Sequence, residues 1–296
     1  MDNLRGAILM VCAMFFFAVE DAFIKFLASD FPVGQILAVI SGGAAIGFAI
    51  YLRLRGMPIW HNDYLHPKVL MRSGVDVVGS LMFSTALALI PLTTASAVLQ
   101  ATPIVVAMGA AIFLGQEVGW RRWIAIFVGF CGVMLIVRPG MEGFTPSTLL
   151  AVGGMLCLAS RDLITRSLNL PISGPQLSFH VYTLMAPAGI ALALLLGQEF
   201  VMPNGTQAGI FAVATVFGMG AYLLIVAATR AGNAGIISSF RYSRMVFALT
   251  IGYVVFAERP DAPTLIGAAI VIGSGIYTLL REARLARPSK RQKPAL

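Results

Sequence analysis

The sequence contains few charged residues. Only 11% of its 296 residues are Asp, Glu, Lys or Arg, whereas 58% are hydrophobic and the mean hydropathy is +0.86. A soluble domain carries about a quarter charged residues, because water must wet its surface. The shortage of charge therefore excludes an ordinary soluble domain and predicts an all-α integral membrane protein, surrounded mostly by lipid.

Cysteines and catalytic motifs are scarce as well. The three cysteines, Cys12, Cys131 and Cys157, lie inside apolar runs without the spacing of metal ligands, so we expect no metal site. The sequence has no phosphate-binding Gly-Lys-Ser/Thr loop, no His-Glu-x-x-His motif and no nucleophile elbow. We therefore expect no cofactor. A membrane-embedded enzyme remains a remote alternative, which chemical conversion of a solute in proteoliposomes would reveal.

Apolar runs long enough to cross a bilayer recur along the whole chain. A membrane-spanning helix needs about 20 mostly apolar residues. Turn residues such as Pro203-Asn204-Gly205 separate most of the runs. Splitting the two continuous stretches at Pro91 and near Gly232 avoids helices far longer than a bilayer. The predicted spans are residues 6–27, 33–53, 69–90, 93–114, 120–137, 148–168, 174–196, 206–228, 233–256 and 264–281.

The positive charge indicates membrane topology. The net charge is +8, but Lys and Arg lie between the apolar runs and in the tail and form no continuous basic face, so we expect lipid as a partner and not nucleic acid. With the N-terminus inside, only Lys25, Arg138 and Arg259 lie outside. Because cytoplasmic loops carry the excess of Lys and Arg, we predict that both termini are cytoplasmic, in a bacterial inner membrane. The cytoplasmic side then collects Arg5, Arg53, Arg55, Lys68, Arg72, Arg121, Arg122, Arg161, Arg166, Arg230 and the tail.

One stretch of the chain occurs twice. Residues 14–27 read MFFFAVEDAFIKFL and residues 155–168 read MLCLASRDLITRSL, with Glu20 opposite Arg161. The same shift pairs Glu117 with Glu258. We therefore predict two repeats, residues 1–138 and 139–283, followed by a basic tail, 284–296. Five spans per repeat is an odd number, so the second repeat is predicted to be inverted, as in many secondary transporters.

Several short motifs identify a family resemblance. The segments Ala97-Val98-Leu99-Gln100-Ala101-Thr102-Pro103, Leu114-Gly115-Gln116-Glu117 and Phe256-Ala257-Glu258 resemble those of EamA domains in the drug/metabolite transporter superfamily. This resemblance implies a ten-helix carrier whose central cavity is lined by helices 1, 3, 4, 6, 8 and 9. Within the family the chain resembles YddG-type amino-acid exporters. Through residues 240–244 and 257–261 it also resembles uptake carriers for S-adenosylmethionine or riboflavin.

Charged residues inside the predicted spans form a candidate gate. Each costs about 2.5–3.5 kcal/mol at mid-bilayer, so it needs a partner, water or a function. The candidates are Glu20, Asp21, Asp76, Arg161, Asp162, Arg241 and Arg244. By helical rise the last five share the cytoplasmic half of the membrane, where we predict an ion-pair latch, whereas Glu20 and Asp21 lie near the outer end of the first span. The alternatives are static pairing and, for Arg161 and Arg166, snorkelling to the headgroups.

Polar residues on apolar helices form a candidate substrate cavity. Asp76, Ser80, Phe83, Ser84 and Leu87 share one face of the third span. A proline in the fourth span loosens that helix and frees backbone groups. An amphipathic metabolite requires such apolar and aromatic walls with a few polar groups, although a helix–helix hydrogen bond is the alternative for any single Ser or Tyr. The predicted cavity residues are Ser80, Phe83, Ser84, Gln100, Thr102, Tyr222, Ser238, Phe240, Arg241 and Tyr242.

These observations predict a secondary carrier with a small-molecule substrate. Arg241 or Arg244 is expected to meet a substrate carboxylate. Amino-acid export is the main prediction, uptake of a metabolite such as S-adenosylmethionine or riboflavin is the alternative, and the protein is expected to act as a monomer. His180, without an acidic neighbour in its own span, is expected to be a packing residue.

Overall fold

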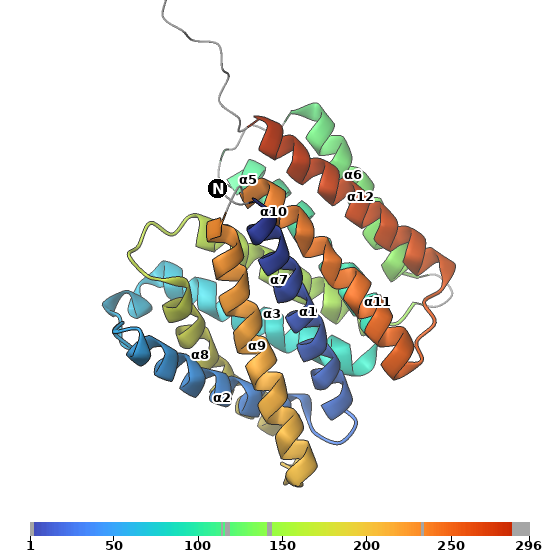
Figure 1. The fold of residues 1–296 in the computed structure, drawn as a ribbon. Coiled ribbons are helices and arrows are strands. Elements are labelled where there is room, and N and C mark those ends of the chain that lie inside the picture. The colour runs from blue at the N-terminus through green and yellow to red at the C-terminus, as the bar shows by residue number, and fades with distance from the viewer. Residues whose placement is uncertain (1–2, 114, 116–118, 141–143, 232–233, 286–296) are drawn as a thin grey trace, which may run out of the picture.

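The computed structural model describes residues 3–113, 115, 119–140, 144–231 and 234–285, and all the regular secondary structure in these residues is helical (Figure 1). The first predicted repeat contains α1 (Asn3–Leu27), α2 (Val33–Leu54), η1 (Asn62–Leu65), α3 (Pro67–Leu89), α4 (Leu92–Leu99), α5 (Thr102–Phe113) and α6 (Trp120–Val137). The second contains α7 (Thr148–Arg166), α8 (Gly174–Leu195), α9 (Gly205–Ala231), α10 (Ala234–Ser239), η2 (Phe240–Tyr242), α11 (Ser243–Phe256) and α12 (Ala262–Leu285).

Local sequence signals explain where several helices begin. Pro67 occupies the first position of α3, where a missing N–H costs nothing. Ser173 and Gln176 form a capping box at the start of α8, in which each side chain bonds the backbone of the other residue. Pro91 has an extended backbone and separates α3 from α4, as predicted. The other predicted separation, at residues 232–233, lies outside the described residues.

The described residues of each predicted span are mostly helical, but two spans are broken. In the described part of the chain, six helical segments are long and apolar enough to cross a membrane: α1, α2, α4 with α5, α7, α8 and α9. The break between α4 and α5 lies at Gln100 and Ala101, just before the proline that predicted it. The break between α10 and α11, at Phe240–Tyr242, was not predicted, because no proline marks it.

The helix bounds in the two halves match. Adding 141 to the first and last residues of α2, Val33 and Leu54, gives those of α8, Gly174 and Leu195. The same shift places the break before α5 onto the break before α11. The agreement supports a duplicated unit, while its inverted orientation and the cytoplasmic termini stay predictions. Glu117, the predicted counterpart of Glu258, lies outside the described residues.

The helices pack in pairs, which leaves a layered bundle. The closest pairs are α1 with α9, α3 with α7, α2 with α8 and α6 with α12. Figure 1 shows α2 and α8 on one side, α6 and α12 on the other, and the remaining helices between them. A Cβ at Gly34 would overlap the carbonyl of Gly189, so α2 and α8 cross in backbone contact. The broken helices lie between these two outer pairs (Figure 1).

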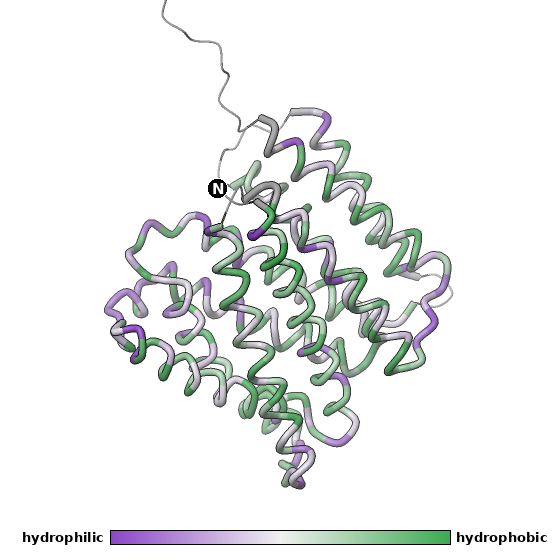
Figure 2. Tube along the Cα trace, viewed as in Figure 1, coloured by the Kyte–Doolittle hydropathy of each residue, from purple (hydrophilic) through white to green (hydrophobic). Residues whose placement is uncertain are grey.

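The outer helix faces are apolar. Figure 2 shows hydrophobic residues along the helices, with hydrophilic residues mostly at helix ends and in loops. Large side chains such as Ile46, Phe127, Val216 and Val254 are exposed. In water so many exposed apolar side chains would favour aggregation, whereas lipid tails solvate them.

An ion pair joins the two outer helices α6 and α12. Arg138 ends α6 and contacts Asp261, just before α12, at 2.5 Å. The Arg138 guanidinium lowers the pKa of the Asp261 carboxyl from 3.8 to about 2. Because the folded-state pKa is depressed, the pair stabilises the protein above about pH 4, and this contribution is lost as the pH falls through about 2.

This gives a pH-dependent prediction. We expect Asp261→Asn to have a lower melting temperature than the wild type at pH 6, and the gap to shrink steadily between about pH 4 and pH 2. The side chain of Asp261 is 52% exposed, so the gap is expected to be small. Melting curves in detergent at several pH values measure it. A gap independent of pH would contradict a role for the Asp261 charge.

Candidate functional site

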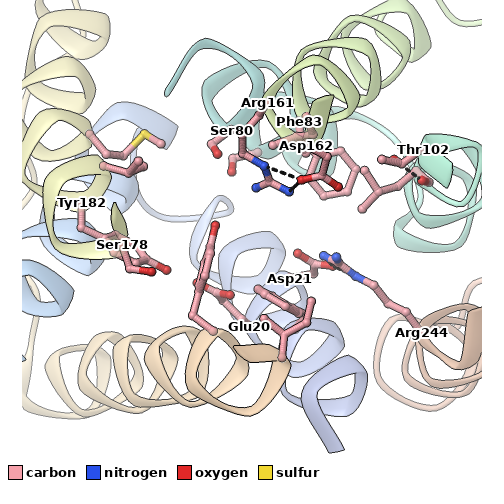
Figure 3. A pocket seen from close by; sticks show the side chains of 18 of the residues that line it. Glu20, Asp21, Ser80, Phe83, Thr102, Arg161, Asp162, Ser178, Tyr182 and Arg244 are labelled. Carbon is pink, nitrogen blue, oxygen red and sulfur yellow. Dashed lines mark hydrogen bonds and ion pairs between the residues drawn. The ribbon is translucent and has the colours of Figure 1, made fainter. Parts of the chain in front are cut away.

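A cavity of about 340 Å³ lies inside the bundle. Its walls come from α1, α3, the α4–α5 break, α7, α9, η2 and α11, as expected from the family resemblance. They also come from α2 and α8, which corrects the expectation that only six spans line it. Figure 3 shows Arg161 and Asp162 on one wall, Glu20 and Asp21 on another, and Ser178 and Tyr182 on a third. The cavity extends to Thr165 and Gly174, where α7 ends and α8 begins.

Most predicted cavity residues line this space. They are Ser80, Phe83, Ser84, Gln100, Thr102, Tyr222 and Arg241. Ser238, Phe240 and Tyr242 do not, which corrects the prediction. Ser238 lines a separate small hollow near Arg166, Phe240 is exposed, and the ring of Tyr242 is buried against Gly275 of α12. The unpredicted 3-10 turn rotates the chain there, so that only Arg241 faces the cavity.

The two helix breaks contact each other. The Gln100 side chain donates a hydrogen bond to the Tyr242 carbonyl over 3.1 Å, and the Thr102 hydroxyl donates to the Leu99 carbonyl over 2.6 Å. Backbone groups freed by a break inside a membrane need such partners, because lipid offers none. Besides lining the cavity, Gln100 and Thr102 therefore form hydrogen bonds that stabilise the helix breaks.

The substitution Gly275→Ala tests the packing of the second break. A Cβ at Gly275 would overlap the Tyr242 hydroxyl, so the ring has to move and the Gln100–Tyr242 hydrogen bond is strained. We expect destabilisation of about 1–3 kcal/mol, typical of overpacking, and reduced transport. Gly273→Ala on the same helix is the control, because a Cβ there meets no described atom within 4 Å. Equal melting temperatures for both variants would show that the contact is unimportant.

One charge network joins α3, α7 and η2. Arg161 donates to Asp76 over 3.1 Å and to Asp162 over 2.8 Å, and Arg241 lies 3.6 Å from Asp162. Arg72 lies 3.2 Å from Asp76. Asp76 is buried behind the cavity wall, whereas Arg161, Asp162, Arg241 and Arg72 line the cavity. Arg72, predicted only as a cytoplasmic topology signal at the start of the third span, therefore also belongs to this network.

Arg244 belongs to a different pair. Its guanidinium donates to the Asp21 carboxylate over 2.5 Å, and lies 5.1 Å from the centre of the Phe17 ring. The prediction that Arg244 joins the cluster around Asp162 is therefore wrong, as is the separation of Asp21 from the other charges. Helix α11 starts at the break, which brings residue 244 level with the last third of α1. Both residues line the cavity.

Glu258 closes the end of the bundle at which α1 and α11 finish. Its carboxylate accepts hydrogen bonds from the N–H groups of Leu92 over 2.6 Å and Thr93 over 3.0 Å, at the start of α4. A negative charge there also interacts favourably with the helix dipole. Ala257, with a left-handed φ of 50°, turns the chain so that Glu258 can reach back.

Lys25 completes this closure. Its ammonium donates to the carbonyls of Leu87 and Ile90 and lies 3.7 Å from Glu258. Four helices, α1, α3, α4 and α11, are thus connected at one end. The sequence predicted Lys25 only as a charge on the external side of the membrane, and no local pattern indicated this role.

Several cavity residues were not predicted. Phe17, Ser178, Tyr182 and Met185 line the cavity, and Tyr182 and Tyr222 contact each other with ring centroids 5.6 Å apart. The helical face shared by Ser178, Tyr182 and Met185 in α8 was the available signal. His180 lies off this face. Its ring shares a hydrogen bond with the Ser73 hydroxyl and stacks on the Tyr64 ring, which supports the packing role.

Comparison with known proteins gives the family. The model of the EamA-like transporter family matches residues 4–138 and 145–280. A riboflavin transporter of Vibrio cholerae is 26% identical over 96% of both chains. An S-adenosylmethionine uptake transporter of Rickettsia conorii is 26% identical over 90% of both chains, and a pseudopaline exporter of Pseudomonas aeruginosa is 26% identical over 90% of this chain and 93% of its own.

A solved structure supports the fold alone. One crystal structure superposes with a TM-score of 0.67 at 16% identity, covering 96% of this chain and 100% of the other. Together with the two matches to the family model, the apolar helix faces indicate a multi-pass membrane protein with a small-molecule substrate. This chain belongs to the EamA-like transporter family.

Proposed function

We propose that the protein is a secondary carrier that exports neutral or aromatic amino acids, or related amphipathic metabolites, across a bacterial inner membrane. The observation that carries the proposal is the cavity, whose apolar and aromatic walls also carry acidic and basic side chains. Such a lining suits a solute with an apolar body and charged ends. Alternating access would follow from rocking the two repeats around the cavity, with the second repeat inverted and both termini in the cytoplasm.

Uptake of a larger metabolite is the second candidate. The names of the relatives include carriers for riboflavin and S-adenosylmethionine as well as an exporter, so they support both directions. Without ATP, a carrier moves its substrate down whichever gradient exists. The direction is therefore a property of the gradients that the cell maintains.

Counterflow in proteoliposomes tests the proposal. Vesicles are loaded with one unlabelled solute, and uptake of the labelled solute is followed for phenylalanine, tryptophan, threonine, methionine, S-adenosylmethionine and riboflavin. Amino-acid export predicts transient accumulation of one or more of the four amino acids. Accumulation of riboflavin or S-adenosylmethionine alone would favour the second candidate, and no accumulation of any solute would contradict both.

The charge network of α3, α7 and η2 is proposed to act as a latch between access states. Arg241 is the exposed member, with 34% of its side chain accessible, and its pair with Asp162 is the longest. Neutralising Asp76 or Arg241 is expected to change the rates at which thiol probes from each side reach a cysteine in the cavity. Unchanged rates in both variants would leave static pairing as the role of the network.

A further inference from the structure

One carboxylate that lines the cavity, that of Glu20, has no hydrogen-bond or ion-pair partner among the residues that the structure describes. Asp21, Asp76 and Asp162 each form an ion pair with an arginine. Glu20 also lines the cavity, but among the described residues it has no hydrogen bond and no ion pair within 4.0 Å. An unpaired acid inside a membrane is costly, so it marks a group that meets water, a proton or a ligand.

The predicted repeat shows how this imbalance arises. The shift of 141 residues places Glu20 opposite Arg161, which has both Asp76 and Asp162 as partners. The same shift places Phe217 opposite Asp76, so Glu20 of the first predicted repeat and Phe217 of the second occupy the positions equivalent to the ion pair between Arg161 and Asp76. The polar groups of the cavity are therefore asymmetric, and Glu20 is the acidic group that has no arginine ion pair.

The surroundings of Glu20 suit an organic cation. Its carboxylate packs directly over Gly218 of α9, and Tyr222 lies one helical turn further along the same face. Phe17 lies one turn before Glu20 on α1 and already has the Arg244 guanidinium 5.1 Å from its ring centre, whereas its ring centroid lies 5.4 Å from that of Tyr222, which is the aromatic side chain left to face a solute. A carboxylate beside aromatic faces is a favourable site for a positively charged nitrogen, through ionic hydrogen bonds and cation–π attraction.

A surplus of basic groups lies on the other wall. The network around Asp162 contains three arginines and two aspartates, so it carries one surplus positive charge. Arg241, its most exposed member, lies in the same cavity as Glu20. In Figure 3, Glu20 lies across the cavity from Arg161 and Asp162. A solute with an ammonium and a carboxylate group would complement both walls.

We propose that Glu20 is the subsite that binds the ammonium group of the transported solute, with Tyr222 as its aromatic wall. This inference rests on the proposed carrier function and adds to it the class of substrate, a zwitterionic or cationic amine. It also assigns a ligand-binding role to a residue first predicted only as part of a gate.

Binding of matched probes tests the subsite separately from transport. Phenylalanine carries both an ammonium and a carboxylate group. The amine 2-phenylethylamine carries only the ammonium, and 3-phenylpropionate carries only the carboxylate. Calorimetry on the purified protein in detergent measures their affinities for the wild type and Glu20→Gln. We expect Glu20→Gln to weaken the binding of 2-phenylethylamine and phenylalanine about tenfold or more, because one charge-assisted hydrogen bond is lost. The affinity for 3-phenylpropionate is expected to stay the same or to increase.

A second variant moves the carboxylate without removing it. A Cβ at Gly218 would overlap the Glu20 carboxylate, so Gly218→Ala is expected to weaken the binding of phenylalanine and 2-phenylethylamine. The affinity for 3-phenylpropionate is expected to stay unchanged. Gly209→Ala on the same helix and Glu199→Gln in an exposed loop are the controls, because a Cβ at Gly209 meets no described atom within 4 Å. Melting temperatures confirm that each variant is folded.

The outcomes separate the two proposals. Amine binding that depends on Glu20, together with no counterflow by the wild type, would support the subsite and contradict the transport proposal. Counterflow of phenylalanine with equal amine affinities in the wild type and Glu20→Gln would overturn the subsite. Two other results would also overturn the subsite. One is a wild type that does not bind 2-phenylethylamine, and the other is a Glu20→Gln variant that binds this amine normally and loses only proton-driven transport.

Discussion

Arg161→Met is expected to destabilise the protein by about 3–5 kcal/mol, the typical cost of breaking a buried ion pair by removing one partner. Arg161 holds Asp76 and Asp162 together, and only 1% of the Asp76 side chain is exposed. Without the guanidinium, Asp76 keeps only the contact with Arg72. Thermal unfolding in detergent, read by size-exclusion chromatography after heating, should show a fall in melting temperature on the order of 10 °C.

Arg241→Met is the matched control for this result. Arg241 contacts the same network at 3.6 Å but is 34% exposed, so its removal is expected to cost less than about 1 kcal/mol. The two substitutions remove the same charge from the same cluster and differ in burial. If Arg161→Met melted no lower than Arg241→Met, the network would not stabilise the contact between α3 and α7.

Glu258→Ala is expected to open the end of the bundle at which α1 and α11 finish. The substitution removes two charge-assisted hydrogen bonds to the start of α4 and the counter-charge of Lys25. Each such bond is worth roughly 1.5–3 kcal/mol. A loss of this size in the closed state would raise the open population about tenfold or more.

Cysteine labelling measures that opening. Ser84 lines the cavity on α3, one turn before the Leu87 carbonyl that Lys25 contacts, so Ser84→Cys is placed in a variant lacking Cys12, Cys131 and Cys157. An impermeant thiol reagent added from the side predicted to be external should react about tenfold faster or more when Glu258 is replaced. Glu199→Gln serves as the control in an exposed loop. An unchanged rate would show that Glu258 does not hold the closure.

The sequence predicted the fold well because hydrophobic runs and turn residues mark helices directly. The predicted span 120–137 coincides with α6, and Pro103 indicated the first helix break. The second break has no proline, and depends on Tyr242 fitting against Gly275 from α12. A contact between distant residues of this kind leaves no local pattern.

The candidate site was predictable in its residue types but not in its pairings. Helical spacing brought Ser80, Phe83 and Ser84 to one face, and all three line the cavity. Depth estimates along single helices placed Asp21 and Arg244 in different halves of the membrane, yet they form a pair. Depth depends on helix tilt and packing, which the spacing of residues along one helix does not contain.

The central claim is that the solute passes through the cavity between the two halves. The direct measurement is counterflow by a Ser80→Cys variant lacking the native cysteines, before and after a methanethiosulfonate reagent adds a bulky group to residue 80, which lines the cavity. We expect normal counterflow before modification, little counterflow after it, and protection of the thiol by the transported solute. Full modification of the thiol with an unchanged rate of counterflow would contradict it.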